Sequence, residues 1–202
     1  MTEDIHKIVP RETIAPLKEF TSKLLTWNQS INLIAGSTEE DLWERHIVDS
    51  AQLLKTLPES GKILDLGSGG GLPALVIGII TKYSGLPLHI DMIEKDARKC
   101  AFLKHVVLHF DLSANVYNQS INQVKPTPYD AVTSRALADL EALIGFAEPR
   151  IKKGGYCVFP KGKNSKQEIE SALLSWNFDY KSIQSVTSDE AKILKIWDIQ
   201  RA

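Results

Sequence analysis

One acid and three glycines carry the clearest chemical pattern in this chain, Asp65-x-Gly67-x-Gly69-x-Gly71, directly after a short apolar run. Glycine at alternate positions admits positive φ and removes each Cβ that would keep the backbone away from a ligand. A helix that follows such a loop offers unpaired N–H groups to a polar molecule. The pattern therefore predicts a strand that runs into a ligand-binding loop.

Two classes of ligand compete for this loop. Gly69-x-Gly71-x-x-Ala74 formally meets the dinucleotide fingerprint, which leaves an NAD(P)-binding oxidoreductase as an alternative. Pro73 intrudes into the turn that should present N–H groups to a pyrophosphate, and the carboxylate of Asp65 would repel that anion. A carboxylate suits the ammonium of an amino-acid moiety, and D-x-G-x-G-x-G resembles the first motif of class I S-adenosylmethionine-dependent methyltransferases. We therefore favour the methyl donor over NAD.

A second acid, Glu94, ends the next run of apolar residues. A carboxylate at the carboxyl end of that strand can accept hydrogen bonds from two ribose hydroxyls, as it does in nucleotide-binding α/β folds. Asp91 lies three residues earlier and faces the other side by strand alternation. The dipole of the following helix also favours an acid at position 94, and the two roles are compatible. We predict that Glu94 binds the donor.

The predicted secondary structure changes near residue 60 from helices alone to alternating strands and helices. Before it the pattern is helical, with an apolar stripe along residues 17–27 and a capping box, Ser37-x-x-Glu40, that should open a second helix. We therefore expect an N-terminal helical extension over residues 1–60 and a Rossmann-like domain over residues 61–202.

Strands and helices alternate in the second part. Strands are expected at 63–66, 88–93, 115–118, 131–133, 156–159, 181–186 and 193–199. Helices are expected at 72–82, 97–110, 137–148 and 167–176. This alternation predicts an α/β fold with a mostly parallel seven-stranded sheet, and the last two strands should form an antiparallel pair at one edge.

Length and composition limit the class of protein. The 202 residues carry a net charge of −1, and no stretch is long and apolar enough to span a membrane. Residues 1–7 lack the basic and apolar regions of a signal peptide. Cys100 and Cys157 form neither a disulfide framework nor a metal-ligand pattern, so both should be buried small residues. We expect a cytoplasmic protein without a bound metal.

Local charge is more informative than net charge. Residues 150–166 contain no acid and six basic residues: Arg150, Lys152, Lys153, Lys161, Lys163 and Lys166. Such a stretch could face phosphates, which also leaves a non-enzymatic RNA-binding protein as an alternative.

Further motifs occur in order along nearly the whole chain. They are Trp27-Asn28-x-x-Ile31-Asn32-Leu33, Trp43-x-Arg45-His46-x-x-Asp49-Ser50, Asp65-x-Gly67-x-Gly69-x-Gly71-Leu72-Pro73, Ser134-Arg135-Ala136 and Lys161-Gly162. Together they closely resemble the bacterial small-subunit ribosomal RNA methyltransferase G family, also called glucose-inhibited division protein B. The resemblance implies transfer of methyl from S-adenosylmethionine to N7 of a guanine in 16S ribosomal RNA of the 30S subunit. A small-molecule methyltransferase is the alternative within the same fold.

The resemblance also implies roles for particular residues. Gly67 and Leu72 should contact the donor, and Arg135 should line the same site and position the reactants. Asn122 and Gln123 fall at the adenosine end, where the family's usual acid and the arginine before it are absent. Two further departures are Ile34, where the family has threonine, and Ala74, where it has glycine.

The expected chemistry needs no general base, because guanine N7 has a lone pair and no proton to lose. A Ser-His-Asp hydrolase formed by His46, Asp49 and Ser50 is implausible, because all three should lie on one helix. There Arg45 and Asp49 should form an i,i+4 ion pair.

Contacts to RNA are expected at the cleft and at one loop. The family resemblance favours Arg45 and His46 as residues that touch RNA or brace the donor loop. Lys161 and Lys163 follow a predicted strand at the carboxyl edge of the sheet, and we assign them to RNA contact. We expect a monomer.

Overall fold

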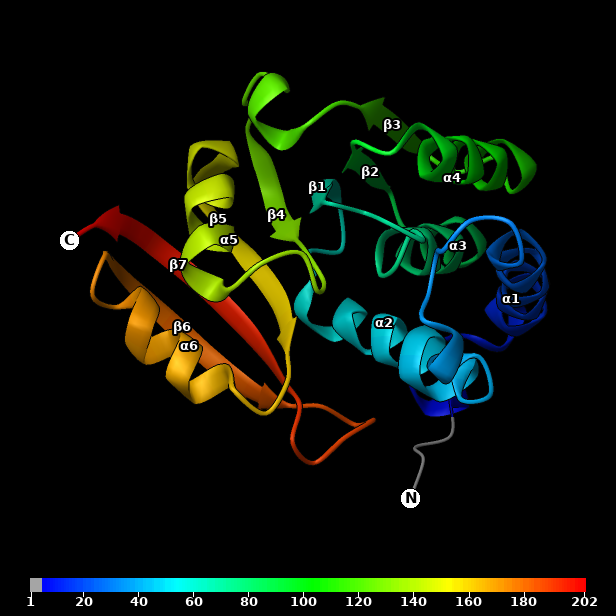
Figure 1. The fold of residues 1–202 in the computed structure, drawn as a ribbon, viewed down its shortest axis with the longest axis horizontal. Helices are drawn as coiled ribbons and strands as arrows, with labels where there is room; N and C mark the ends of the chain where they lie inside the picture. The colour runs from blue at the N-terminus through cyan, green and yellow to red at the C-terminus, as the bar shows by residue number, and fades with distance from the viewer. Residues whose placement is uncertain (1–4) are drawn as a thin grey trace.

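A seven-stranded sheet forms the centre of the computed structural model, which describes residues 5–202 (Figure 1). Residues 1–4, part of the segment that lacks the features of a signal peptide, lie outside the described part. The strand order is β3-β2-β1-β4-β5-β7-β6. Strands β1 to β5 are mutually parallel, and β7 lies between β5 and β6 and is antiparallel to both. The predicted fold class and the antiparallel pair at one edge are confirmed.

All seven predicted strands are present. Their bounds are β1 Gly61–Leu66, β2 Leu88–Glu94, β3 Ala114–Asn118, β4 Tyr129–Thr133, β5 Ile151–Lys161, β6 Trp176–Gln184 and β7 Lys192–Arg201. The largest extension is in β5, whose basic and glycine-rich first half lacks the apolar run by which a buried strand is recognised.

The helices vary in length and type. The α-helices are α1 Ile14–Asn28, α2 Asp49–Ala51, α3 Ala74–Ser84, α4 Ala97–His109, α5 Leu140–Ala147 and α6 Ser165–Ala172. A π-helix, η4 Trp43–Val48, precedes α2. Single 3-10 turns are η1 Ile5–Lys7, η2 Arg11–Thr13, η3 Gly36–Thr38, η5 Gln52–Thr56, η6 Ile121–Gln123 and η7 Glu148–Arg150.

The predicted capping box at Ser37 is wrong. The segment forms the short turn η3, without a side-chain cap, and the helical run begins only near Trp43. Asn28 organises this part of the chain instead: its Oδ1 accepts hydrogen bonds from the backbone N–H groups of Leu33 and Ile34, and its Nδ2 donates to Glu39. A tertiary contact has thus replaced the local cap.

The helix predicted over residues 167–176 ends earlier, at Ala172. Trp176 begins β6 instead and is buried under α5 and α6. Its apolar character fits the helical period equally well, which is why the sequence pattern alone could not separate the two elements.

Each face of the sheet carries its own hydrophobic cluster, and neighbouring strand residues alternate between them. Ile63 of β1 faces the cluster under α1, α3 and α4, whereas Leu64 and Leu66 face the cluster under α5 and α6. In Figure 1 the two sets of helices accordingly lie on opposite sides of the sheet.

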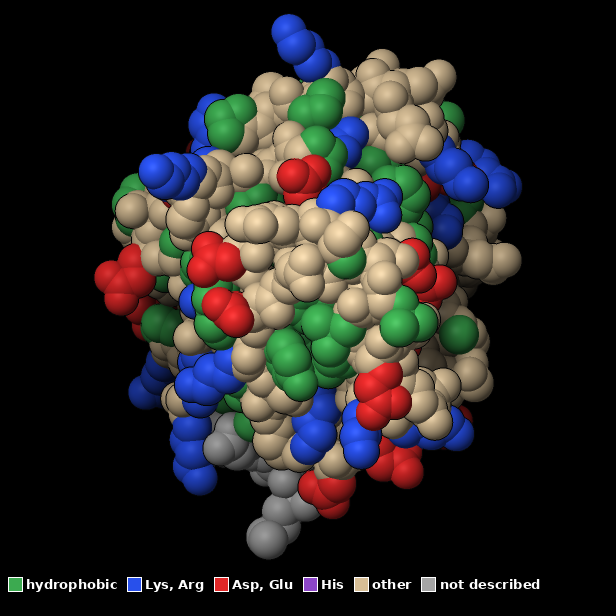
Figure 2. Space-filling view, turned by 90° about the vertical axis from the view of Figure 1, so that its left-hand side faces the viewer, with side chains coloured by type: hydrophobic (Ala, Val, Ile, Leu, Met, Phe, Trp, Pro, Cys, Tyr) green, Lys and Arg blue, Asp and Glu red, His purple; other side chains and the backbone are tan. Residues whose placement is uncertain are grey.

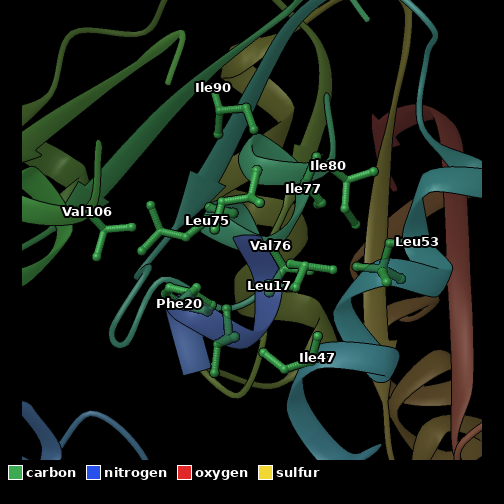
Figure 3. Packing of buried hydrophobic residues seen from close by; sticks show 14 of the residues in the cluster. Leu17, Phe20, Ile47, Leu53, Leu75, Val76, Ile77, Ile80, Ile90 and Val106 are labelled. Atoms are coloured by element: carbon green, nitrogen blue, oxygen red, sulfur yellow. The ribbon is translucent and has the colours of Figure 1, made fainter. Parts of the chain in front are cut away.

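The N-terminal segment belongs to the larger of these clusters. Leu17 and Phe20 of α1, together with Ile47 and Leu53, surround α3 in Figure 3 and are fully buried. Helix α3 is apolar on all sides, with every residue from Ala74 to Thr81 buried. Because the sheet covers only one side of α3, the N-terminal helices are needed to cover the other.

Candidate functional site

A cavity of about 500 Å³ opens at the carboxyl ends of β1, β2 and β4. Strand β1 lies between β2 and β4, so the cavity sits where the strand order reverses, the usual ligand site of an open parallel sheet. The cavity is lined by Leu33, Gly67, Ser68, Gly69, Gly70, Leu72, Ile93, Glu94, Lys95, Lys99, Gln119, Ser120, Ile121, Asn122, Arg135, Ala136, Leu137 and Phe146.

The glycine loop lines this cavity, and at Gly67 and Gly70 it leaves no room for a side chain. Gly67 has a φ of +66°, and a Cβ there would lie 2.7 Å from a methyl carbon of Leu137. Gly70 meets the N-terminal segment instead, where a Cβ would lie 2.8 Å from the carbonyl oxygen of Leu33. Gly71 also has a positive φ, +79°, but lies outside the lining residues. The loop therefore presents backbone to the cavity.

Glu94 lies at the centre of the cavity wall. Its Oε2 accepts a hydrogen bond of 2.9 Å from Gly69 N–H, and its Oε1 accepts one of 2.8 Å from Asp96 N–H. The carboxylate is thus held against the glycine loop with lone pairs left for a ligand. Asp91 faces away, as expected, and accepts a hydrogen bond from the hydroxyl of Tyr129.

Asp65 lies behind the glycine loop and outside the lining residues. It is 1% exposed, and its Oδ1 accepts a hydrogen bond from the Thr133 hydroxyl. Its Oδ2 has no hydrogen-bond partner among the described residues. Burial raises the pKa of Asp65 to about 6, although the hydroxyls of Ser68 and Thr133 and the charge of Arg135 oppose the shift. A buried acceptor without a partner is what a ligand's ammonium group could satisfy.

The segment 119–124 forms the far end of the cavity. Asn122 lines it, whereas Gln123 does not: the amide oxygen of Gln123 accepts hydrogen bonds from the backbone N–H and the hydroxyl of Ser120. Gln123 thus closes the turn, and Asn122 is left to face the cavity.

A buried arginine that sequence analysis had placed in a basic surface stretch holds this turn. Arg150 is 5% exposed and donates to the carbonyl oxygens of Ile121 and Val124, at 2.7 and 3.1 Å, and to that of Phe146 at 2.7 Å. Phe146 and Ile121 both line the cavity. Arg150 therefore fixes two parts of the wall relative to each other.

Arg135 links the cavity to the N-terminal segment. Its Nη2 lies 2.9 Å from His46 Nδ1, and its Nη1 lies 3.4 Å from Asp49 Oδ2 and 3.3 Å from the carbonyl oxygen of Arg45. A guanidinium only donates, so His46 Nδ1 must accept and the ring proton must sit on Nε2, which then donates to Thr38. Burial, followed by the charges of Arg135 and Arg45, lowers the pKa of His46 to about 4.

The predicted ion pair between Arg45 and Asp49 is wrong. Asp49 pairs with Arg135, and Arg45 contributes its carbonyl oxygen to the same guanidinium while its side chain is exposed. The two residues lie where a π-helix passes into an α-helix. A π-helix has more residues per turn, so the i,i+4 alignment of an α-helix is lost.

The basic stretch 150–166 does not form one surface patch. Arg150 is buried, Lys152 pairs with Asp130, and Lys161 donates to Glu168 at 2.7 Å with its side chain 8% exposed. Lys163 is exposed. On the face shown in Figure 2, which includes the side where α6 and β6 lie, basic and acidic side chains are interspersed.

Several cavity residues carried no expected role. Leu33, Gly70 and Leu137 line the cavity, and Asn28 holds Leu33 in place. The motif that contains Asn28 and Leu33 had been noted only as part of the family resemblance. The sequence pattern does not indicate that Leu137 lines a cavity, because a single leucine after Arg135 is equally compatible with the start of a helix.

Comparison with known proteins places the chain in a family. The model of the rRNA small subunit methyltransferase G family matches residues 13–197. The chain belongs to this family. The ribosomal RNA small subunit methyltransferase G of Dinoroseobacter shibae is 43% identical over 92% of this chain and 96% of the relative. The protein of the same name from a Ruegeria species is 41% identical over 96% of this chain and 94% of the relative.

Solved structures with the same fold are more distant in sequence. The ribosomal protein L11 methylase of Lactobacillus delbrueckii superposes with a TM-score of 0.58 at 15% identity, over 74% of this chain and 76% of that one. The TYW2 protein of M. jannaschii, solved in complex with AdoMet, gives a TM-score of 0.58 at 12% identity, over 86% and 80%. These similarities confirm the class I methyltransferase fold.

Membership of the methyltransferase G family makes the chain a methyltransferase that uses S-adenosylmethionine. The geometry agrees, because the backbone N–H of Gly69, which a dinucleotide pyrophosphate would need, is bonded to the carboxylate of Glu94. The NAD(P) alternative is therefore discarded. Within residues 5–202, none of the helices combines the length and the apolar character needed to cross a bilayer.

Proposed function

We propose that this chain methylates N7 of a guanine in 16S ribosomal RNA of the small ribosomal subunit, acting as a monomer in the cytoplasm. The family match over residues 13–197 carries the proposal, and all the residues that line the cavity at the glycine loop lie within that match. The relatives are named for the small-subunit ribosomal RNA they modify.

The donor is assigned to the cavity at the glycine loop. Glu94 would accept hydrogen bonds from the ribose, Asn122 would face the adenine, and Gly67, Gly69 and Leu72 would border the rest of the molecule. Asn122 supplies both a donor and an acceptor, which suits the adjacent amino group and ring nitrogen of adenine in place of the family's acid.

Residues outside the lining are assigned supporting roles. Asp65 lies behind the loop with one oxygen unpartnered, and it is assigned to the donor's ammonium group. Gly71 allows the turn into α3, and Gln123 closes the turn that presents Asn122.

The enzyme's task in this reaction is alignment. S-adenosylmethionine supplies an electrophilic methyl group, and the N7 lone pair forms the new bond to carbon while the electrons of the carbon–sulfur bond stay on sulfur. No proton moves, so the reaction needs no general base. Arg135, fixed by His46 and Asp49, would hold donor and acceptor in line while excluding water.

Three residues are assigned to RNA contact, and a fourth, His46, to an indirect role. Arg45 and Lys163 are exposed and free to meet phosphates. His46 would act through Arg135 rather than by direct contact, because both of its ring nitrogens are engaged. Lys161 would have to leave Glu168 to reach a phosphate.

The proposal is tested by transfer of labelled methyl to 30S subunits from a strain that lacks this modification. The expected product is 7-methylguanosine in 16S ribosomal RNA, mapped by aniline cleavage at the modified base. Label found only on protein or on small molecules would refute the proposal.

A further inference from the structure

A second cavity, of about 340 Å³, lies next to the donor cavity. The two share Arg135 and Ala136, which lie on the segment that follows β4. The second cavity is lined by Asp49, Arg135, Ala136, Ala138, Pro160, Lys161, Gly162, Glu168, Ser185, Ala191, Lys192 and Ile193. These residues come from the N-terminal segment, the segment after β4, the end of β5, α6, the β6–β7 loop and the start of β7.

The position of the donor directs its methyl group toward this second cavity. With Glu94 assigned to the ribose and Asn122 to the adenine, Gly67 and Arg135 are among the lining residues that remain for the sulfonium end. The second cavity begins on the other side of Arg135. An acceptor base must approach within bonding distance of the methyl group, and the second cavity is the concave space adjoining that end.

Two carboxylates, those of Asp49 and Glu168, line the second cavity. Asp49 Oδ1 accepts hydrogen bonds from Gln52 and Thr187, and Asp49 Oδ2 faces Arg135 at the long distance of 3.4 Å. Glu168 Oε2 accepts from Lys161, whose Nζ also donates to the carbonyl oxygen of Ala138. Both carboxylates are thus held in place by neighbours while remaining partly exposed, 17% for Asp49 and 25% for Glu168.

Two of the three cations that line this cavity are paired with those acids. Arg135 faces Asp49 and Lys161 is bonded to Glu168, whereas Lys192 donates to the neutral amide oxygen of Gln184. The pairing of Arg135 and Lys161 matters, because an unpaired cation beside the base would oppose the positive charge that methylation creates on the ring.

We propose that the second cavity is the acceptor site, in which Asp49 and Glu168 bind the Watson–Crick edge of the flipped-out guanine. This inference rests on the proposed function. Guanine presents adjacent donors there, N1–H and the 2-amino group, whereas adenine presents an acceptor at N1 that a carboxylate would repel. N7 lies on the opposite edge of the base, so these contacts leave its lone pair free for the methyl group.

The same two carboxylates favour the reaction as well as the choice of base. The methyl carbon forms a bond to N7 and breaks its bond to sulfur, so the positive charge passes from the sulfonium to the guanine ring. Hydrogen bonds from N1–H and the amino group to carboxylates become stronger as that charge develops. Their effect is therefore expected in the rate of transfer and not in donor affinity.

The test compares Glu168→Gln and Asp49→Asn with two controls, Glu170→Gln on the same helix α6 and Asp41→Asn near η4, both at exposed acids. We expect at least a tenfold loss of methyl transfer to 30S subunits in E168Q, with the affinity for S-adenosylhomocysteine, measured by calorimetry, within about twofold of wild type. D49N should lose at least as much methyl transfer, because the substitution also removes the ion pair that holds Arg135. The controls should retain wild-type transfer. In E168Q the amide oxygen can still accept from Lys161, so the fold is preserved.

A base analogue separates recognition from a structural effect. Subunits reconstituted with inosine at the mapped guanine lack only the 2-amino group, and wild-type enzyme should methylate them at least tenfold more slowly. In at least one carboxylate variant the further loss caused by inosine should be clearly smaller, because the partner is already missing. Additive losses in both variants, or variants that transfer at the wild-type rate, would overturn the acceptor site. Failure of the wild-type enzyme to methylate guanine at all would instead overturn the proposed function.

Discussion

At the scale of single residues, Asp65 combines two features that seldom occur together in a structural acid. It is buried with one carboxylate oxygen unpartnered, and its pKa is raised to about 6. An uncompensated buried charge is unfavourable for the fold, so a ligand that supplies a positive group would relieve the cost. The residue is thus better explained by binding than by stability.

Asp65→Asn tests that explanation. We expect the affinity for S-adenosylhomocysteine to fall by on the order of tenfold or more, about 1.4 kcal/mol. Wild-type affinity should also weaken as the pH falls through about 6, where Asp65 takes up a proton, and the variant should lose this pH dependence. Asp91→Asn, at a buried acid of the neighbouring strand, is the control. Unchanged affinity in D65N would limit Asp65 to shaping the loop.

The pKa of His46 is shifted downward, whereas that of Asp65 is shifted upward, so the two residues change the stability of the fold in opposite directions as the pH falls. Its folded pKa of about 4 lies below the ordinary value of 6.5, so the unfolded chain takes up a proton first as the pH falls. His46 therefore lowers stability progressively from pH 6.5 to about 4. The raised pKa of Asp65 increases stability as the pH falls from 6 to 3.8, so the two partly cancel in wild type.

The contribution of His46 is isolated by comparing melting temperatures of wild type and His46→Gln between pH 7.5 and 4.5. The variant should gain stability relative to wild type as the pH falls below 6.5. His105→Gln, at an exposed histidine of α4, is the matched control. Parallel curves for wild type and H46Q would show that His46 does not titrate in this way.

At the scale of elements, the turn 119–124 depends on a side chain from another part of the chain. Arg150 donates to three carbonyl oxygens, two of them in this turn, and is the turn's link to α5. Arg150→Met should therefore weaken donor binding about tenfold, because the adenine end of the cavity loses its fixed position. Lys153→Met, at an exposed position of β5, should bind the donor normally. Normal binding by both variants would mean that the turn holds its shape without Arg150.

The order of the elements could be predicted from the sequence because strand and helix periods are local. The strand before Gly67 and the helix after Pro73 follow from apolar runs and turn residues within ten positions. Glu94 could be placed at the cavity for the same reason, since the end of a parallel strand fixes the edge of the sheet at which a residue lies.

Contacts between distant segments could not be predicted in this way. The guanidinium of Arg135 meets His46 and Asp49 about 90 residues away, and Arg150 meets Ile121 across 29 residues. Local rules placed Arg150 in a surface stretch and paired Asp49 with Arg45, because helical spacing and charge runs say nothing about which elements meet in space. The π-helix that redirects Asp49 likewise has no sequence signature comparable to a cap.

At the scale of the whole molecule, one hydrophobic core includes residues from both sides of position 60, the predicted boundary between the helical extension and the Rossmann-like domain. Trp27 of α1 packs against Phe102 of α4 with ring centroids 5.5 Å apart, and α1, α3 and α4 share one hydrophobic cluster. The segment before residue 60 also supplies Leu33 to the cavity at the glycine loop and Asp49 to the second cavity. The N-terminal helices therefore serve both stability and the site, and they should not fold or unfold by themselves.

Unfolding in urea tests this coupling with two variants that each keep one tryptophan and carry phenylalanine at the other three positions. One keeps Trp27 in the N-terminal segment, and the other keeps Trp176 at the start of β6, in the opposite cluster. Within each variant, the fluorescence midpoint should coincide with the midpoint from far-ultraviolet circular dichroism, because exposing α3 by removing α1 would uncover fully buried residues such as Val76. Saturating S-adenosylhomocysteine should shift both signals upward together, since ligand binding stabilises the whole cooperative unit. A Trp27 transition that precedes the loss of circular dichroism would instead establish an independent N-terminal domain ending near residue 60.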